Sequence, residues 1–253
     1  GTDERGGAVR LQTGALAAAW RGAANAPQLA FSLAAPTFAQ ALRPQRTLTA
    51  RAEAIDGLAA FSAGDWRIEG GFTNADVTDP DLPVTASGFS GRWGAHPEGG
   101  LAILSFRDAA GRVSDKTAPA RFEPLTLSAM AGEVRDGIVT STGDVRLAAG
   151  GAALARFKAR HDIAASAGEA QVLAQDLTFA PLLELENVTG LARGVAANVR
   201  GPVDADFTAR WQGETIAAAG ALDLKGVSLA AAFGPIENVR GRIVFDDAFA
   251  LTS

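Results

Sequence analysis

Cysteine is absent from this 253-residue sequence, and histidine occurs only twice, at His96 and His161. Cys and His side chains hold most transition metals in proteins, so the sequence predicts no metal site and no cofactor. The lack of cysteine fits an oxidising compartment in which the chain folds without disulfides. Charge is modest, with 23 basic and 28 acidic residues and a net charge of −5. A nucleic-acid-binding protein would carry a basic stripe, so no nucleic-acid partner is expected.

Long hydrophobic runs are also missing. No stretch stays apolar over the ~18 residues that a membrane-spanning helix needs, and no signal peptide is recognisable at the start. The chain begins at Gly1-Thr2 and stops abruptly at Leu251-Thr252-Ser253. We therefore expect it to be a segment of a larger protein whose targeting and anchoring parts lie elsewhere.

The sequence does contain a repeated alternation of apolar and polar residues, which is typical of strands with one dry and one wet face. In the segment VDADFTARW, for example, Val203, Phe207 and Trp211 share one face and the charged residues share the other. About fifteen such segments follow one another, separated by short turn signals such as Asp136-Gly137 and Lys225-Gly226. Neighbouring segments are expected to pair as antiparallel hairpins.

The predicted fold is therefore all-β, built as one long antiparallel meander. At ~4.8 Å per strand, fifteen strands would extend over about 70 Å, and so large a sheet must coil, fold over or close. Residues 36–43 (PTFAQALR) and 181–194 (PLLELENVTGLARG) depart from the alternation. Each has a proline near its start, and Gly194 could follow a helix end, so one or two short helices are predicted there.

Catalytic chemistry is hard to find in the remaining polar residues. His161 and its neighbour Asp162 point to opposite faces of a strand, so we interpret His161 as an ordinary strand residue. Asp76, Asp79 and Asp81 are spaced loosely like calcium ligands but lack the glycine and glutamate of an EF-hand loop, and a solvated turn is favoured. No nucleophile elbow or acid–base pair is apparent. The sequence predicts no catalytic residue and no enzyme.

The apolar faces are the remaining candidate site. Small Ala and Gly residues alternate on them with isolated bulky side chains, whereas a tightly packed sandwich would favour Val, Ile and Leu throughout. The unfilled volume could hold acyl chains, or the small residues could let two sheets pack closely; the pattern alone leaves both possibilities open. The predicted lining residues are Leu48, Trp66, Ile68, Phe72, Phe157, Ile163, Val203, Phe207, Trp211, Ile216, Leu222, Leu224, Val227, Leu229, Phe233, Val239, Ile243 and Phe245.

Four successive segments carry a resemblance to a known family. They are FEPLTLSAMAGEVRDGIVTSTGDV (122–145), KARHDIAASAGEAQVLAQDLTFA (158–180), LARGVAANVRGPVDADFTARWQGE (191–214) and AAFGPIENVRGRIVFDDAFALTS (231–253). In order and content they resemble the C-terminal half of the bacterial YdbH-like proteins, which belong with TamB and the wider AsmA-like group of intermembrane lipid transporters. The resemblance covers residues 120–253, and residues 1–119 are similar only as alternating β sequence.

The resemblance implies that residues 1–253 form one elongated, U-shaped β-groove segment in the periplasm of a Gram-negative cell. It implies an inner-membrane anchor and an outer-membrane contact outside this chain, with a small outer-membrane lipoprotein near the C-terminal end. Phospholipid acyl chains would slide along the apolar interior while head groups stay wet. A sixteen-carbon tail in water costs roughly 12 kcal/mol at ~0.8 kcal/mol per methylene, and a continuous trough removes most of that cost. The alternative is a structural or adhesive β-sandwich or solenoid with a closed apolar core and no lipid ligand.

Overall fold

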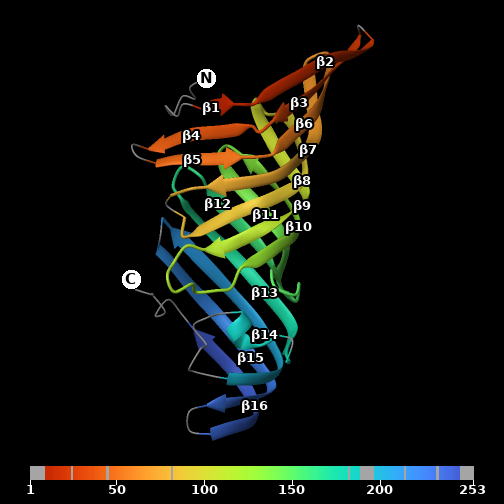
Figure 1. The fold of residues 1–253 in the computed structure, drawn as a ribbon. Coiled ribbons are helices and arrows are strands. Elements are labelled where there is room, and N and C mark those ends of the chain that lie inside the picture. The colour runs from red at the N-terminus through yellow and green to blue at the C-terminus, as the bar shows by residue number, and fades with distance from the viewer. Residues whose placement is uncertain are drawn as a thin grey trace.

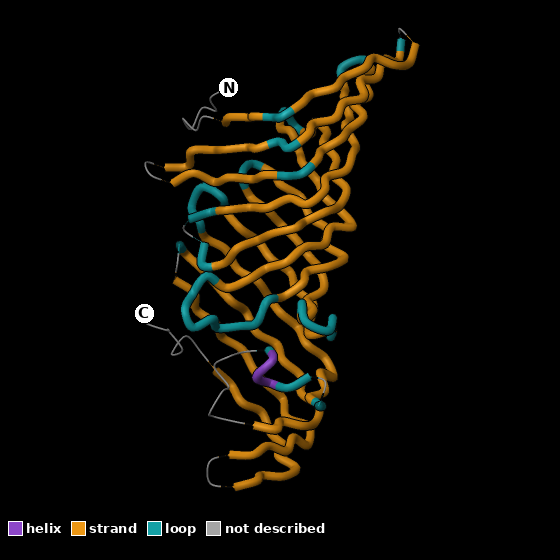
Figure 2. Tube along the Cα trace, viewed as in Figure 1, coloured by secondary structure: helices purple, strands orange, loops and turns teal. Residues whose placement is uncertain are grey.

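The computed structural model describes residues 9–23, 25–43, 46–80, 82–181, 183–188, 197–213, 215–231 and 234–245. Within these ranges the chain forms one 16-stranded antiparallel sheet and a single 3₁₀ turn (Figure 2). The predicted all-β class is thus confirmed. The elements are β1 (Val9–Gln12), β2 (Ala15–Ala23), β3 (Ala26–Ala34), β4 (Thr37–Arg43), β5 (Arg46–Arg51), β6 (Ala54–Ser62), β7 (Asp65–Thr78), β8 (Val84–Glu98), β9 (Leu101–Asp115), β10 (Leu125–Arg135), β11 (Ile138–Leu147), β12 (Ala153–Asp162), β13 (Ala167–Phe179), η1 (Leu185–Asn187), β14 (Ala197–Gln212), β15 (Thr215–Ala231) and β16 (Gly234–Phe245).

From β7 to β16 the sheet is a simple meander in which every strand pairs with its neighbours in sequence. The N-terminal part is forked. The first half of β7 pairs with β6, whereas its last residues pair with β5. Strands β1, β4 and β5 therefore form one branch and β2, β3 and β6 another, and Figure 1 shows the two branches spreading apart at the top. In the described residues β1 and β16 do not pair with each other, so the sheet remains open.

β-Bulges near the middle of the long strands bend this sheet. Asn74, Asp108, Ala129 and Asp176 each have a left-handed φ of about 50°, and each lies at a shift of strand register. A bulge bends its strand and increases the local twist. Bulges on several of the long strands accordingly fold the sheet into a trough, in which the nearer halves of the strands cross obliquely over the farther ones (Figure 1).

Two local predictions were wrong. The predicted helix at 36–43 is instead strand β4 from Thr37 to Arg43, because pairing with β1 on one side and β5 on the other satisfies its backbone groups. The bend before β4 comes from Ala35 at a φ of 48°. Lys225-Gly226 is a bulge within β15, not a turn, with Gly226 at a φ of 104°. In the second predicted helix, 181–194, the described residues hold only η1, and residues 189–194 lie outside the described ranges.

Candidate functional site

Strand register gathers most of the predicted lining residues on one face of the sheet. Directly opposed residues in an antiparallel pair point to the same side. Val172 pairs with Phe157 on one side and with Phe207 on the other, and Trp211 pairs with Ile216. We call this side the apolar face. By pairing and strand alternation it holds Leu48, Trp66, Ile68, Phe72, Phe157, Val203, Phe207, Trp211, Ile216, Leu222, Leu224, Val227, Leu229, Val239 and Ile243.

Three predicted residues stand apart. Ile163 lies in the turn between β12 and β13, where it is half-buried and its N–H donates to the Gly137 carbonyl at 3.0 Å. Phe233 lies outside the described residues. Phe245 ends β16 with its backbone opposite Gly220, and its side chain is not described.

Aromatic rings on the apolar face lie against glycines of the neighbouring strand. A Cβ atom on Gly57 would stand 2.5 Å from the Phe31 ring, and one on Gly132 would stand 2.6 Å from the Phe106 ring. The other contacts of this kind join Phe89 with Gly111, Phe157 with Gly143, and Trp211 with Gly168. Glycine in a strand interior often marks such a close approach. A ring that reaches over a glycine lies along the sheet, so the lining is flatter than its bulky residues suggest.

The sequence-based list of lining residues was incomplete in the N-terminal half. Trp93 pairs with Gly70 and with Phe106, and Phe31 pairs with Gly57, so these aromatics lie on the apolar face as well. Phe89 joins the same face opposite Ala75. The alternation within 29–33 and 84–98 carried the signal that could have identified them.

Much of the apolar face is open to solvent. Trp20 is 68 % exposed and Leu16 64 % exposed on β2, while Leu104 is 42 % exposed on β9 and Ile243 is 49 % exposed on β16. Single exposed apolar residues are common, but a group of them such as Trp20, Phe61 and Val77 on β2, β6 and β7 indicates a surface that can bind a partner or ligand. The face is therefore a candidate for an elongated apolar ligand.

One part of the apolar face is covered by the chain itself. Leu183 packs into a buried cluster with Leu147, Leu154, Phe179, Val199, Val203 and Val227, and Leu185 and Val188 pack against it. Glu184 forms an ion pair with Arg200 at 2.9 Å, and the Glu123 N–H donates to the Val188 carbonyl at 3.1 Å. We call residues 183–188 the cover segment. It occupies apolar surface that is open elsewhere along the sheet.

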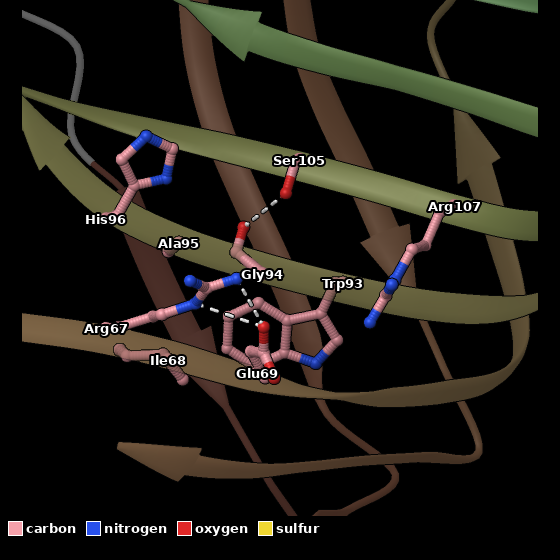
Figure 3. A pocket seen from close by; sticks show the side chains of 9 residues that line it. All are labelled: Arg67, Ile68, Glu69, Trp93, Gly94, Ala95, His96, Ser105 and Arg107. Atoms are coloured by element: carbon pink, nitrogen blue, oxygen red, sulfur yellow. Dashed lines mark hydrogen bonds and ion pairs between the residues drawn. The ribbon is translucent and has the colours of Figure 1, made fainter. Parts of the chain in front are cut away.

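The opposite face is mainly polar, although Leu58, Leu173 and Val244 are exposed on it. One hollow of about 180 Å³ is lined by Arg67, Glu69, His96, Ser105 and Arg107 among others (Figure 3). Arg67 is already engaged by Glu69 at 2.7 Å, and the Ser105 hydroxyl donates to the Gly94 carbonyl at 3.4 Å. These contacts are those of a solvated sheet surface.

The polar residues singled out in the sequence are placed as follows. His161 lies on β12, and its Nδ1 accepts a hydrogen bond from Trp211 Nε1 at 3.1 Å. His96 is exposed near Glu98. Asp79 is 3 % exposed and paired with Arg46, so the predicted solvated turn was wrong at this position. Asp81 lies outside the described ranges, and within those ranges no group of three or more His, Cys, Asp or Glu residues is arranged to hold a metal.

Residues 5–253 match the family model described as "YdbH-like: Intermembrane phospholipid transport protein YdbH". No curated protein and no solved structure matches the chain. Among the described residues, no helix has the length and apolar character needed to cross a membrane.

Proposed function

The chain belongs to the YdbH-like family of intermembrane phospholipid transport proteins, and from this premise we propose that its apolar face carries phospholipid acyl chains across the periplasm. The observation that supports the proposal most directly is the continuity of that face. Strand register keeps it on one side of the sheet from β3 through β7 to β16, and the cover segment occupies part of it. A tail that moves from one strand to the next thus exchanges one apolar surface for a similar one.

The composition of the lining suits movement more than tight binding. Each methylene transferred out of water gains about 0.8 kcal/mol. The free energy of a whole tail in the trough can therefore be close to its free energy in the bilayer. Deep side-chain pockets would hold a tail at fixed positions and slow it. The rings of Phe106, Phe157 and Trp211 lie over neighbouring glycines and leave a smoother lining instead.

The lipid head group belongs at the open mouth of the trough. A charged phosphate is costly to bury without a partner, and water reaches the strand ends at the two long edges of the sheet. We propose that residues 1–253 form one groove segment of a larger periplasmic protein. Parts outside this chain would provide the inner-membrane anchor and the outer-membrane contact, with a small lipoprotein near the C-terminal end.

Site-specific photocrosslinking in cells tests the proposal. A photoreactive residue at Phe207, on the apolar face of β14, is expected to crosslink radiolabelled phospholipid in the intact protein. The matched control is the same residue at Arg210, which is exposed on the opposite face of the same strand. Equal labelling at both positions, or none at Phe207, would contradict the proposal and favour a closed structural core without lipid.

A further inference from the structure

A buried ion pair connects parts of the sheet that are far apart along the chain. Arg46 begins β5 and Asp79 follows β7, and the Arg46 Nε donates to Asp79 Oδ1 at 3.1 Å while its Nη2 contacts Oδ2. The third guanidinium nitrogen, Nη1, reaches the Ala164 carbonyl at 3.5 Å. Ala164 belongs to the turn between β12 and β13, and four strands separate β7 from β12 in the sheet order.

The hydrogen bond from Arg46 to Ala164 joins the two opposite long edges of the sheet. Arg46 and Asp79 lie on the edge that also carries the loop from Lys116 to Pro124, because β9 ends opposite the start of β8. The 163–166 turn lies on the other edge, next to the Asp136-Gly137 turn, as the hydrogen bond from Ile163 to Gly137 shows. An open trough has its mouth between these two edges. At this level, therefore, the mouth is bridged.

The bridge is well packed for a structure that is a single sheet. Arg46 and Asp79 are each 3 % exposed, and Ser166 in the same turn is 1 % exposed. The Lys116 ammonium donates to the carbonyls of Asp79 at 2.8 Å and Leu82 at 2.7 Å, which ties the Asp79 loop to its own edge. Burial of this degree requires the two edges to be in contact along the bridge.

We propose that Arg46, Asp79 and the 163–166 turn form a latch across the mouth of the trough, and that each passing phospholipid opens it. The inference rests on the proposed function. If the tails lie on the apolar face and the head group lies in the mouth, the head group meets the bridge and cannot go past it while the edges touch. Lipid is then held on one side of the latch until the edges separate.

The contact that spans the mouth is suitable for such a latch, because it joins a charged side chain of one edge, Arg46 of the Arg46–Asp79 ion pair, to a backbone carbonyl of the other. A buried pair loses in desolvation much of what it gains in Coulomb attraction, so its net contribution to stability is small. When the edges separate, Arg46 and Asp79 both regain water. Opening is therefore less costly than the separation of an apolar contact of the same size, which would expose that surface without compensation.

Locking the latch tests the inference. Residues 1–253 contain no cysteine, so Thr47→Cys and Ala165→Cys place the only two thiols of this segment at exposed neighbours of the bridge and leave its own residues intact. A short, cleavable bifunctional maleimide then joins the edges. Photoreactive residues at Phe31 on β3 and at Leu222 on β15 report phospholipid on either side of the latch in the intact protein in cells.

The expected result is that crosslinking to radiolabelled phospholipid persists at one of the two positions and is lost at the other, and that cleavage of the linker restores it. Each single-cysteine variant treated with the same reagent should keep both signals, which excludes a general effect of modification. Unchanged signals at both positions after locking would overturn the latch. Absence of signal at both positions before locking would instead overturn the proposed function.

Discussion

The ring of Phe157 on β12 lies over Gly143 on β11, so close that a Cβ atom on Gly143 would stand 2.8 Å from Phe157 Cε1. The two residues are directly opposed in the ladder, and Met130 Cγ would stand 3.0 Å from the same Cβ. Gly143 thus provides the space in which an aromatic side chain can lie along the sheet. A side chain at this position would displace the ring into the trough.

Replacing Gly143 with valine should destabilise the chain by about 1–3 kcal/mol, the usual cost of overpacking a filled site. Urea denaturation followed by circular dichroism measures the change. Thr142→Val is the matched control, because Thr142 is the adjacent residue of the same strand on the exposed face. We expect the control to change stability by less than about 0.5 kcal/mol. Equal effects would show that the ring does not depend on the glycine.

Asp115 should contribute pH-dependent stability at the end of β9. Burial alone would raise the pKa of Asp115, but hydrogen bonds from the Arg121 guanidinium and N–H and from Thr117 outweigh it and hold that pKa well below its usual range. The side chain of an unfolded Asp has a pKa of about 3.9. The stabilisation is therefore complete above about pH 4 and is lost as the pH falls further toward the folded-state pKa.

Asp115→Asn should accordingly lower the free energy of unfolding at pH 7 by about 1.5–3 kcal/mol, the range for hydrogen bonds to a charged group. The difference from the parent chain should shrink between pH 4 and pH 2 in urea titrations. Asp144→Asn is the control, since Asp144 makes only a loose surface pair with Arg156 at 3.7 Å. A difference that stays constant with pH would show that the Asp115 charge is not the cause.

The cover segment should compete with acyl chains for the apolar face. Leu183 is 8 % exposed within the cluster that buries Val203. Leu183→Asp places a charge in that cluster and should release the segment, because an unpaired buried charge is costly. Phospholipid crosslinking from a photoreactive residue at Val203 should then rise. Asn187→Asp adds the same charge at an exposed position of the segment and should leave the crosslinking unchanged; a rise in both variants, or in neither, would show that the segment does not exclude lipid.

The alternation of the sequence was sufficient to predict the all-β class, because side-chain direction has a period of two along any strand. It was insufficient where a bulge adds a residue. Leu224 and Val227 lie on the same face although their spacing is odd, since Gly226 is the extra residue of a bulge. The change of parity at this position suggested a turn, and a single left-handed glycine cannot be distinguished from a turn by its sequence alone.

The long-range features could not be predicted for a different reason. Arg46 and Ala164 are 118 residues apart, and their contact depends on how far the sheet coils between β7 and β12. That coil is the sum of many small twists and bulges, none of which has a strong local signature. The helix predicted at 36–43 failed in a related way, because pairing with two flanking strands overrode a weak local preference.

His161 should make the folded chain less stable as the pH falls below neutrality. Burial is the main cause that lowers the pKa of His161, and the Arg46 charge adds to it, whereas Asp79, Asp162 and a hydrogen bond to the Ala167 backbone act in the opposite direction. The folded chain therefore holds His161 neutral in a range where the unfolded chain, with a His pKa of about 6.5, binds a proton. Stability should decline as the pH falls below about 6.5, by at most about 1.4 kcal/mol per pH unit for this one group.

His161→Gln should remove this part of the pH dependence. The glutamine carbonyl can still accept the hydrogen bond that Trp211 Nε1 donates to His161 at 3.1 Å, but it does not titrate. Urea denaturation at pH 7.5 and pH 5.5 should show a smaller loss of stability in the variant than in the parent chain. His96→Gln changes an exposed histidine near Glu98 and should retain the parent's loss over the same interval. A His161 pKa above 6.5, measured from the imidazole proton shifts by NMR, would contradict the prediction, because the folded chain would then bind the proton more tightly than the unfolded one.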